Sequence, residues 1–295
     1  MFTTEQNGPV VIVRMEADSA SWEQWVLLTS DRHHDSPKCN RQLEKRHLEE
    51  ARQRGAIICD FGDLFDAMQG KFDPRRSMAD VRPEDAKPNY YDLIVQHAAE
   101  DYAPYAQNFA VIGLGNHETA VEDKANTNLT SNLVHRLNSD YGGNVKMGGY
   151  GGWVIFRVTV HHNNRCSLKL KYHHGAGGGG PVTRGVIQTN RQAVYLPDAD
   201  VVVNGHTHDG WHVPIARERV DQRGEQYFDL VHYLRTPGYK NGYNDGASGF
   251  ENIKWQPPKP NGCAWLRLRV EIRPKLHIIV TPFVDVEAPQ VIPGK

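Results

Sequence analysis

The chain has 295 residues, of which 39% are hydrophobic and 23% charged, as is typical of a soluble globular protein with a full core. Its formal net charge of −1 excludes steering to nucleic acid or to a membrane by the charge of the whole molecule. No apolar run approaches the ~20 residues that a membrane helix needs, and the first residues lack a signal-peptide pattern.

The first half of the chain alternates between short apolar runs and helical segments. Strands are predicted at 24–30 and 56–60. The helix predicted between them, at 40–54, has Asn40 as its cap and ends at Gly55. The next predicted elements are a polar loop or inserted helical segment at 70–89, a helix at 90–103, a strand at 108–115 and a helix at 127–139.

The second half is predicted to be mostly β. Strands are expected at 152–160, 167–172 and 200–204, and the runs CAWLRLRVEI and KLHIIVTPFV follow later. Residues 238–262, rich in Gly, Pro and Asn, are predicted to form a long surface loop. This order indicates an α/β fold in which a mixed sheet packs on a second sheet, with helices outside.

We expect a single domain over residues 1–295, with core motifs at 24–210 and with C-terminal strands and the long loop at 211–295. The four cysteines lie far apart and form no Cys-x-x-Cys pair. In a chain of this size they favour reduced thiols, so we expect a cytoplasmic protein.

Polar, ligand-type side chains follow five of the predicted strands. Taken singly, each group has an ordinary explanation, such as a turn, an Asx-turn or a helix cap. If all lie at one edge of one sheet, they face one cleft, as a metal site requires. The five groups are Asp31 with His33, Asp63 with Asp66, Asn116 with His117, His173 with His174, and His206 with His208.

In this order the motifs Asp-x-His, Gly-Asp-x-x-Asp, Gly-Asn-His-Glu, His and Gly-His-x-His, over residues 31–208, resemble those of the calcineurin-like metallophosphoesterases. The resemblance implies a four-layer α/β/β/α double β-sandwich with a two-metal site. It implies a phosphoester hydrolase in which a water bridging two ions ~3.5–4 Å apart loses a proton to become the nucleophile.

The resemblance also implies the ligands. Asp63 is the expected bridge between the ions. Oxygen and nitrogen ligands without a thiolate suit Mn, Fe, Ni or Zn, with Mn favoured. Asp31, His33 and His208 are expected to complete one metal site, and Asn116, His174 and His206 the other.

Within the pair His173 and His174, His174 directly precedes a glycine, as family ligands often do, so we prefer it as the ligand. His173 would point to the opposite face of a continuing strand and stays the alternative.

His117 is expected to face the substrate and to protonate the leaving oxygen as a general acid. Asp66 resembles the family's carboxylate that orients this histidine. Asn116 and His117 would face different directions on an extended strand end. Glu118 is expected to be structural, through hydrogen bonds near the turn. Arg32 is a candidate phosphate contact.

The substrate is expected to be a phosphomonoester or phosphodiester, including a nucleotide or a short nucleic acid, and no membrane partner is expected. The alternative is a DNA or RNA nuclease or another phosphodiesterase. Ala67 stands where protein Ser/Thr phosphatases carry arginine, which disfavours a phosphoprotein substrate. A non-catalytic scaffold is disfavoured because none of the expected ligands is missing. His34 and Asp35, beside the first ligands, are candidate neighbours of the site.

Overall fold

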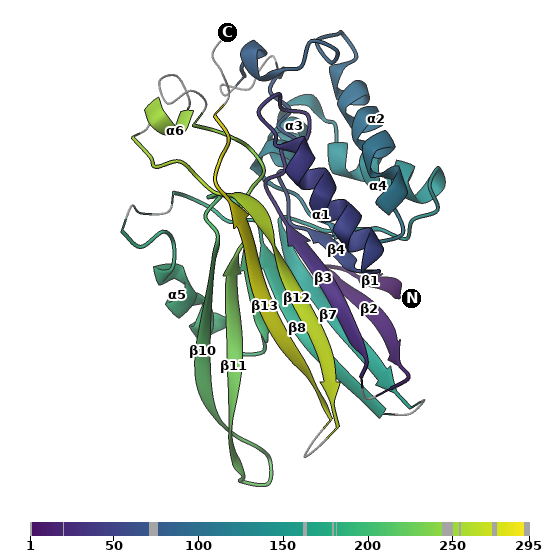
Figure 1. Cartoon of the computed structure of the whole chain (residues 1–295), viewed down its shortest axis with the longest axis vertical. Helices are drawn as coiled ribbons and strands as arrows, with labels where there is room; N and C mark the ends of the chain where they lie inside the picture. Colours follow the sequence, from purple (N-terminus) through teal and green to yellow (C-terminus); the bar gives the residue numbers. More distant parts are fainter. Residues whose placement is uncertain are drawn as a thin grey trace.

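The computed structural model describes residues 2–19, 21–70, 76–161, 164–178, 180, 182–243, 250–253, 255–272 and 276–291. Within them the chain forms two β-sheets that pack face to face, with helices on both outer sides (Figure 1). Two mixed sheets flanked by helices are consistent with the predicted four-layer sandwich.

The larger sheet has seven strands of mixed direction. In spatial order they are β1 (Thr3–Asn7), β2 (Val10–Ala17), β7 (Gly151–Val160), β8 (Asn164–His173), β9 (Val201–Asn204), β11 (Gln226–Arg235) and β10 (Trp211–Val220). β9 lies parallel to both β8 and β11, so the carboxyl ends of these three strands lie at the same edge.

The smaller sheet has six strands. In spatial order they are β13 (His277–Glu287), β12 (Asn261–Glu271), β3 (Glu23–Thr29), β4 (Ile57–Asp60), β5 (Phe109–Ile112) and β6 (Lys146–Met147). β3, β4 and β5 run parallel and end at one edge. β4 and β5 are buried along their whole length, as parallel strands covered on both faces are.

The main hydrophobic core lies between the sheets. Burial alternates along β7, so that Val154 and Phe156 face the core. Leu28 of β3 and Leu266 of β12 belong to the same buried cluster and face the larger sheet. The period of two along these strands therefore holds the sheets together.

Helices cover both outer faces (Figure 1). Leu48, Ile94 and Leu133 of three helices join a second buried cluster on the outer face of the smaller sheet. Leu196, beyond another helix, packs with Val202 of β9 on the outer face of the larger sheet. The helical segments are α1 (Arg41–Gln53), α2 (Tyr90–Tyr102), α3 (Asn116–Ala125), α4 (Leu129–Ser139), α5 (Ile187–Tyr195), α6 (Phe250–Ile253), η1 (Met78–Asp80) and η2 (Ala103–Tyr105).

Most predicted strands and helices are found close to their predicted bounds. The helix predicted at 40–54 is α1, and the Asn40 side chain caps it by accepting a hydrogen bond from the main-chain N–H of Leu43. The hairpin of β1 and β2 was not predicted. Within the segment 70–89, η1 is a short helical turn, and residues 71–75 lie outside the described part of the chain.

Two expectations about local structure are wrong. Asn116 and His117 do not continue an extended strand, because they form the first turn of α3. The start of the predicted surface loop is buried: Tyr239 is 0% exposed, and its main-chain N–H donates to the Asp31 carbonyl. This segment follows β11, whose carboxyl end lies beside that of β9, and so it packs into the site; residues 244–249 lie outside the described part of the chain.

The five polar groups come from two sheets and not from one. Asp31, Asp63 and Asn116 follow β3, β4 and β5 of the smaller sheet, whereas His174 and His206 follow β8 and β9 of the larger sheet. The expectation of one edge of one sheet is therefore corrected. The carboxyl ends of the two stacked sheets meet, and the side chains face one another across the layer boundary.

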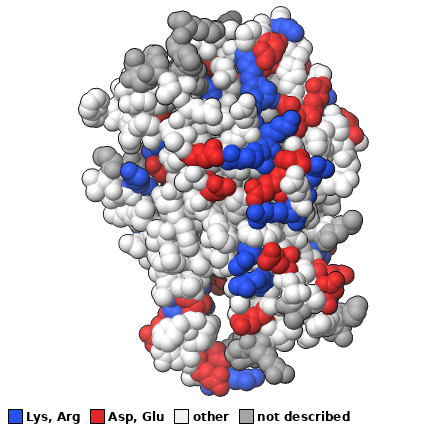
Figure 2. Space-filling model, viewed as in Figure 1, with Lys and Arg blue, Asp and Glu red and all other residues white. Residues whose placement is uncertain are grey.

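On the face shown in Figure 2, basic and acidic side chains are interleaved and do not gather into one basic band. Along α1, for example, Arg52 pairs with Glu49 and Arg54 with Glu50. Among the described helices, none is both long and apolar enough to cross a membrane.

Candidate metal centre

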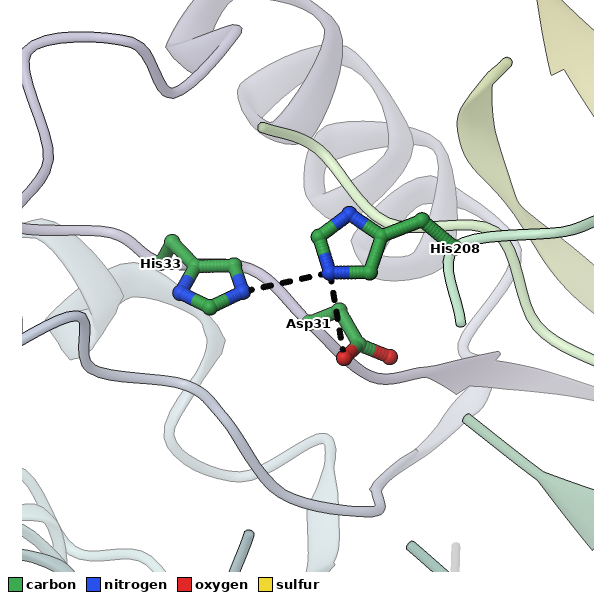
Figure 3. Close-up of side chains that lie close together, drawn as sticks. All are labelled: Asp31, His33 and His208. Atoms are coloured by element: carbon green, nitrogen blue, oxygen red, sulfur yellow. Dashed lines mark hydrogen bonds and ion pairs between the residues drawn. The ribbon is translucent and has the colours of Figure 1, made fainter. Parts of the chain in front are cut away.

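Asp31, His33 and His208 converge, although they come from loops after different strands (Figure 3). Asp31 and His33 follow β3, and His208 follows β9. Nε2 of His208 lies 3.4 Å from Oδ1 of Asp31 and 3.4 Å from Nε2 of His33. One carboxylate oxygen and two imidazole nitrogens at these separations form a candidate site for a divalent metal ion.

Asp63, His174 and His206 form a second such group. Nε2 of His174 lies 3.1 Å from Oδ2 of Asp63 and 3.3 Å from Oδ1 of Asn116. Asp63 also groups with His33 and His117, so its carboxylate lies between the two candidate sites, with His117 beside it. The structure therefore brings together the seven residues that the sequence analysis named as ligands.

Most of the seven ligand candidates have a left-handed main-chain conformation, which directs their side chains. For residues with a Cβ such conformations cost about 1–3 kcal/mol each, persist only where the surroundings fix them, and cluster at functional sites. The five ligand candidates concerned are Asp31 (φ 53°), His33 (φ 47°), Asp63 (φ 51°), His206 (φ 73°) and His208 (φ 55°).

Two glycines let the main chain approach the ligand carboxylates. A Cβ on Gly115 would overlap the carboxylate of Asp63, and a Cβ on Gly205 would overlap the side chains of Ser30 and Asp31. These positions therefore require glycine to keep the carboxylates where they are.

Each central carboxylate is held through one oxygen and turns the other toward the cluster. Oδ2 of Asp31 accepts a hydrogen bond from the main-chain N–H of His206 at 2.8 Å, and another from the Ser30 hydroxyl. Oδ1 of Asp63 accepts one from the main-chain N–H of His117 at 2.9 Å. Oδ1 of Asp31 is buried and faces the imidazole nitrogens of His208 at 3.4 Å and His174 at 3.9 Å. A buried carboxylate oxygen of this kind fits a cation.

The orientations of the His33 and His174 rings are fixed by the groups that contact their Nδ1 atoms. Nδ1 of His174 donates to the Phe61 carbonyl oxygen at 3.0 Å, and Nδ1 of His33 faces Oδ1 of Asp66 at 2.9 Å. Both arrangements favour the tautomer whose Nε2 carries a lone pair, and both Nε2 atoms face the cluster. Histidines that ligate metals are held in this way.

The charges of the cluster suit a cation. Burial opposes ionisation of Asp63, but the neighbouring His174 keeps the pKa of that carboxyl well below its usual range. Burial lowers the pKa of His174, but Asp63 and Asp31 raise it to about 10. Burial and Lys240 lower the pKa of His33 to about 4, which leaves its imidazole neutral, as in a metal ligand. A bound cation would replace the proton on His174.

His117 is held by the main chain of Asp66. Its Nδ1 donates to the Asp66 carbonyl oxygen at 2.6 Å, whereas Oδ1 of the carboxylate lies 3.7 Å away. Nε2 of His117 lies 4.0 Å from Oδ2 of Asp63. The expected role of Asp66 is therefore corrected: its carbonyl oxygen orients His117, and its carboxylate faces His33.

Lys240 is a site residue that the sequence analysis missed. Its Nζ lies 2.7 Å from Oδ1 of Asp66, and 17% of its side chain is exposed. Burial raises the pKa of Asp66, but Lys240 and His33 bring it well below the usual range. The available signal was a sixth strand end, because Lys240 follows the apolar run that forms β11.

The two adjacent histidines after β8 have different surroundings. His174 is fully buried within the cluster. His173, the last residue of β8, is exposed; its Nδ1 accepts a hydrogen bond from the main-chain N–H of Gly175, and its ring packs on Tyr150. The structure therefore places the preferred candidate, His174, beside Asp63 and leaves His173 outside.

Two buried carboxylates fix the loop after β4. Glu118 accepts hydrogen bonds from the main-chain N–H groups of Asp63, Phe65 and Gly115 at 2.9–3.1 Å. Burial and Asp63 raise the pKa of Glu118 to about 8. Asp35 accepts hydrogen bonds from the main-chain N–H groups of Asp66 and Ala67. Both residues hold main chain, which agrees with the structural role expected for Glu118.

Arg32 does not face the site, contrary to its suggested role as a phosphate contact. It is fully buried and pairs with Asp60 at 2.6 Å and with Glu44 at 3.0 Å. His34 joins the same network through Glu44 and Asp101. These side chains link the first turn after β3 to α1 and α2.

No protein-family model and no curated protein sequence matches the chain. Solved structures are similar to it at low TM-scores. GAP50, described as the anchor in the inner membrane complex of Plasmodium, matches with TM-score 0.43 and 11% identity over 92% of this chain and 90% of its own. Vps29 of Entamoeba histolytica, in complex with zinc, matches with TM-score 0.34 and 9% identity over 88% and 99%.

A third similar structure is an uncharacterised, predicted phosphoesterase of Streptococcus pneumoniae, with TM-score 0.29 and 10% identity over 89% of this chain and 100% of its own.

Proposed function

We propose that the protein is a dinuclear metal-dependent hydrolase of phosphoester bonds. The observation that supports this most is the position of Asp63, whose carboxylate lies between the Asp31–His33–His208 group and the group that contains His174. Two ligand groups that share one carboxylate are what a pair of divalent ions ~3.5–4 Å apart requires.

The donor atoms fit such ions. Asp31 and Asp63 supply carboxylate oxygens, Asn116 supplies a neutral carbonyl oxygen, and imidazole nitrogens supply the remaining contacts. Bound divalent ions supply Lewis acidity toward a phosphoryl oxygen and activate a water molecule. This donor set suits Mn, Fe, Ni or Zn, and we propose Mn for the first trial.

The chain's own residues divide the remaining work. His117 lies at the partly exposed side of the cluster, with 13% of its side chain exposed, and its Nδ1–H is held by the Asp66 carbonyl. Its Nε2 therefore faces the site, and in the imidazolium form of the ring this atom can donate a proton to a leaving oxygen. Lys240 keeps the Asp66 carboxylate ionised, and that carboxylate orients His33.

We propose a phosphoester small enough to approach this partly exposed side, a nucleotide or a short nucleic acid being candidates. The test is an activity screen of chelator-treated protein reloaded with Mn²⁺. The substrates are p-nitrophenyl phosphate, bis-p-nitrophenyl phosphate, and linear and nicked DNA. Hydrolysis that requires added metal is the expected result, and the preferred substrate separates monoesterase, diesterase and nuclease.

Asp63→Asn tests the shared carboxylate and should abolish both metal loading and hydrolysis. Asp123→Asn, an exposed carboxylate on α3, is the matched control and should behave as the unaltered protein. Failure of the two-ion-loaded protein to hydrolyse any of the four substrates, or full activity in Asp63→Asn, would refute the proposal.

A further inference from the structure

His47, Cys263 and Asp285 form a second cluster of ligand-type atoms, outside the centre described above. Cys263 on β12 and Asp285 on β13 are direct partners across the antiparallel pair. Directly opposed residues project to the same face of a sheet, here the outer face, which α1 covers. α1 brings His47 to the same point, and one donor atom from each residue lies within 4.8 Å of the others.

The orientation of His47 leaves one nitrogen for a ligand. Its Nδ1 lies 2.9 Å from the hydroxyl of Tyr239, which also contacts the thiol of Cys263. With Nδ1–H donating to the phenol oxygen and the phenol O–H directed to sulfur, Nε2 of His47 keeps its lone pair. Nε2 is buried and has no hydrogen-bond partner among the described residues.

His47 and Asp285 are too far apart to form a hydrogen bond. Nε2 lies 3.5 Å from Oδ2 of Asp285, beyond the 2.7–3.2 Å of such a bond. A lone pair and a carboxylate oxygen that face one another at this distance leave room for a cation between them.

We propose that His47, Cys263 and Asp285 bind one zinc-class divalent ion. Imidazole nitrogen, thiolate sulfur and carboxylate oxygen are the three donor types of zinc sites, and four-coordination leaves one position. Asp285, whose side chain is 44% exposed, opens that position to water. Binding breaks the S–H bond of Cys263 and releases its proton to solvent, so that the thiolate is the ligand.

Such an ion would cross-link α1 to the β12–β13 pair. His47 lies on α1, and α1 also supplies Glu44 to the network around Arg32. Tyr239, the hydroxyl partner of His47, donates its main-chain N–H to the Asp31 carbonyl. The ion would therefore stabilise the outer side of the loop that carries Asp31 in the metal centre.

Cobalt absorption tests the site separately from activity, because thiolate ligation to Co²⁺ gives an intense near-ultraviolet charge-transfer band. The metal centre has no cysteine among its described ligand groups, so this band reports only a thiolate site. Co²⁺-loaded protein should show the band, and Cys263→Ala should lose it and bind one ion fewer per chain. Cys39→Ala, which removes the partly exposed cysteine, should retain it.

Asp285→Asn alters a half-exposed side chain, so it keeps the test decisive should Cys263→Ala not fold. It should weaken Co²⁺ binding, followed by titration of this absorption band, by about tenfold or more, because loss of even an outer partner of a ligand costs about 10- to 100-fold. Absence of the band at saturating Co²⁺, or its survival in Cys263→Ala, would overturn the site. Neither result depends on whether the protein hydrolyses phosphoesters.

Discussion

Nζ of Lys240 and Nδ1 of His33 face the same oxygen, Oδ1 of Asp66, at 2.7 and 2.9 Å. The lysine keeps the buried carboxylate ionised, and the carboxylate in turn holds the imidazole with Nε2 toward the ligand cluster. A ligand histidine whose second nitrogen faces a carboxylate is fixed in tautomer and direction. Lys240, 174 positions along the chain from Asp66, thus contributes to the arrangement of the candidate ligand group of Asp31, His33 and His208.

Lys240→Met should therefore weaken metal binding at the group formed by Asp31, His33 and His208. Loss of such outer partners reduces metal affinity or activity by about 10- to 100-fold. A Mn²⁺ titration followed by calorimetry measures the change. Lys38→Met, which breaks the Lys38–Asp80 pair at 2.6 Å, is the matched control and should leave Mn²⁺ affinity unchanged. Equal losses in both variants would remove Lys240 from this role.

His174→Ala should lower metal content more than His173→Ala. The reason is burial and direction: Nε2 of His174 lies 3.1 Å from Asp63, whereas His173 is exposed and contacts Tyr150. Elemental analysis of the two purified variants after equal Mn²⁺ loading makes the comparison. The assignment is reversed if His173→Ala proves to be the variant that loses metal.

His117→Ala should leave both ions bound and lower turnover by about 10²-fold or more, the scale of general acid catalysis. The loss should shrink for esters with good leaving groups, such as p-nitrophenolate, which need little protonation. Turnover of esters with leaving groups of graded pKa, measured beside metal content, makes the test. A uniform loss over all leaving groups, or a lost ion, contradicts the role of His117 as the acid.

Asp66→Asn provides a contrast within the same experiment. The main-chain carbonyl of Asp66, which the substitution keeps, holds His117. The carboxylate faces His33 and Lys240 instead. Asp66→Asn should therefore lower metal affinity and leave the dependence on leaving-group pKa as in the unaltered protein.

Acid should destabilise the fold partly through His232. Burial and His212, whose Nε2 lies 3.0 Å from Nδ1 of His232, lower the pKa of His232 to about 4. Between an unfolded-state value near ~6.5 and pH 4 the unfolded chain binds more protons, so stability falls as pH falls. His232→Gln should reduce the stability difference between pH 7 and pH 5 by about 1 kcal/mol. Urea unfolding at both pH values measures it, and an unchanged difference contradicts this source.

The sequence predicted the fold class and most strands because period-two burial and short apolar runs depend on local composition. β7 alternates along its full length, and β4 and β5 are short runs buried throughout. The polar groups could be singled out because each lies shortly after such a run, and the resemblance of their motifs to those of the metallophosphoesterases implied which of them are ligands. The positions of Asp31, Asp63 and His174 at strand ends therefore follow from the sequence just before each of them.

Other features depend on contacts between distant residues, which a local pattern does not contain. Arg32 resembled a phosphate contact, but burial against Asp60 and Glu44 makes it structural. Lys240 lies in a segment whose composition is typical of a surface loop, and only the parallel pairing of β11 with β9 brings it to the site. The exchange of roles between the carbonyl and carboxylate of Asp66 likewise follows from the path of the loop.

The most direct test of the account is the anomalous diffraction of a crystal loaded with Mn²⁺. Two peaks are predicted, about 3.5–4 Å apart on either side of the Asp63 carboxylate. One peak should lie within bonding distance of Asp31, His33 and His208, the other of Asn116, His174 and His206, and Asp63→Asn should lose both. A single peak, or two peaks of which neither contacts Asp63, would contradict the dinuclear centre.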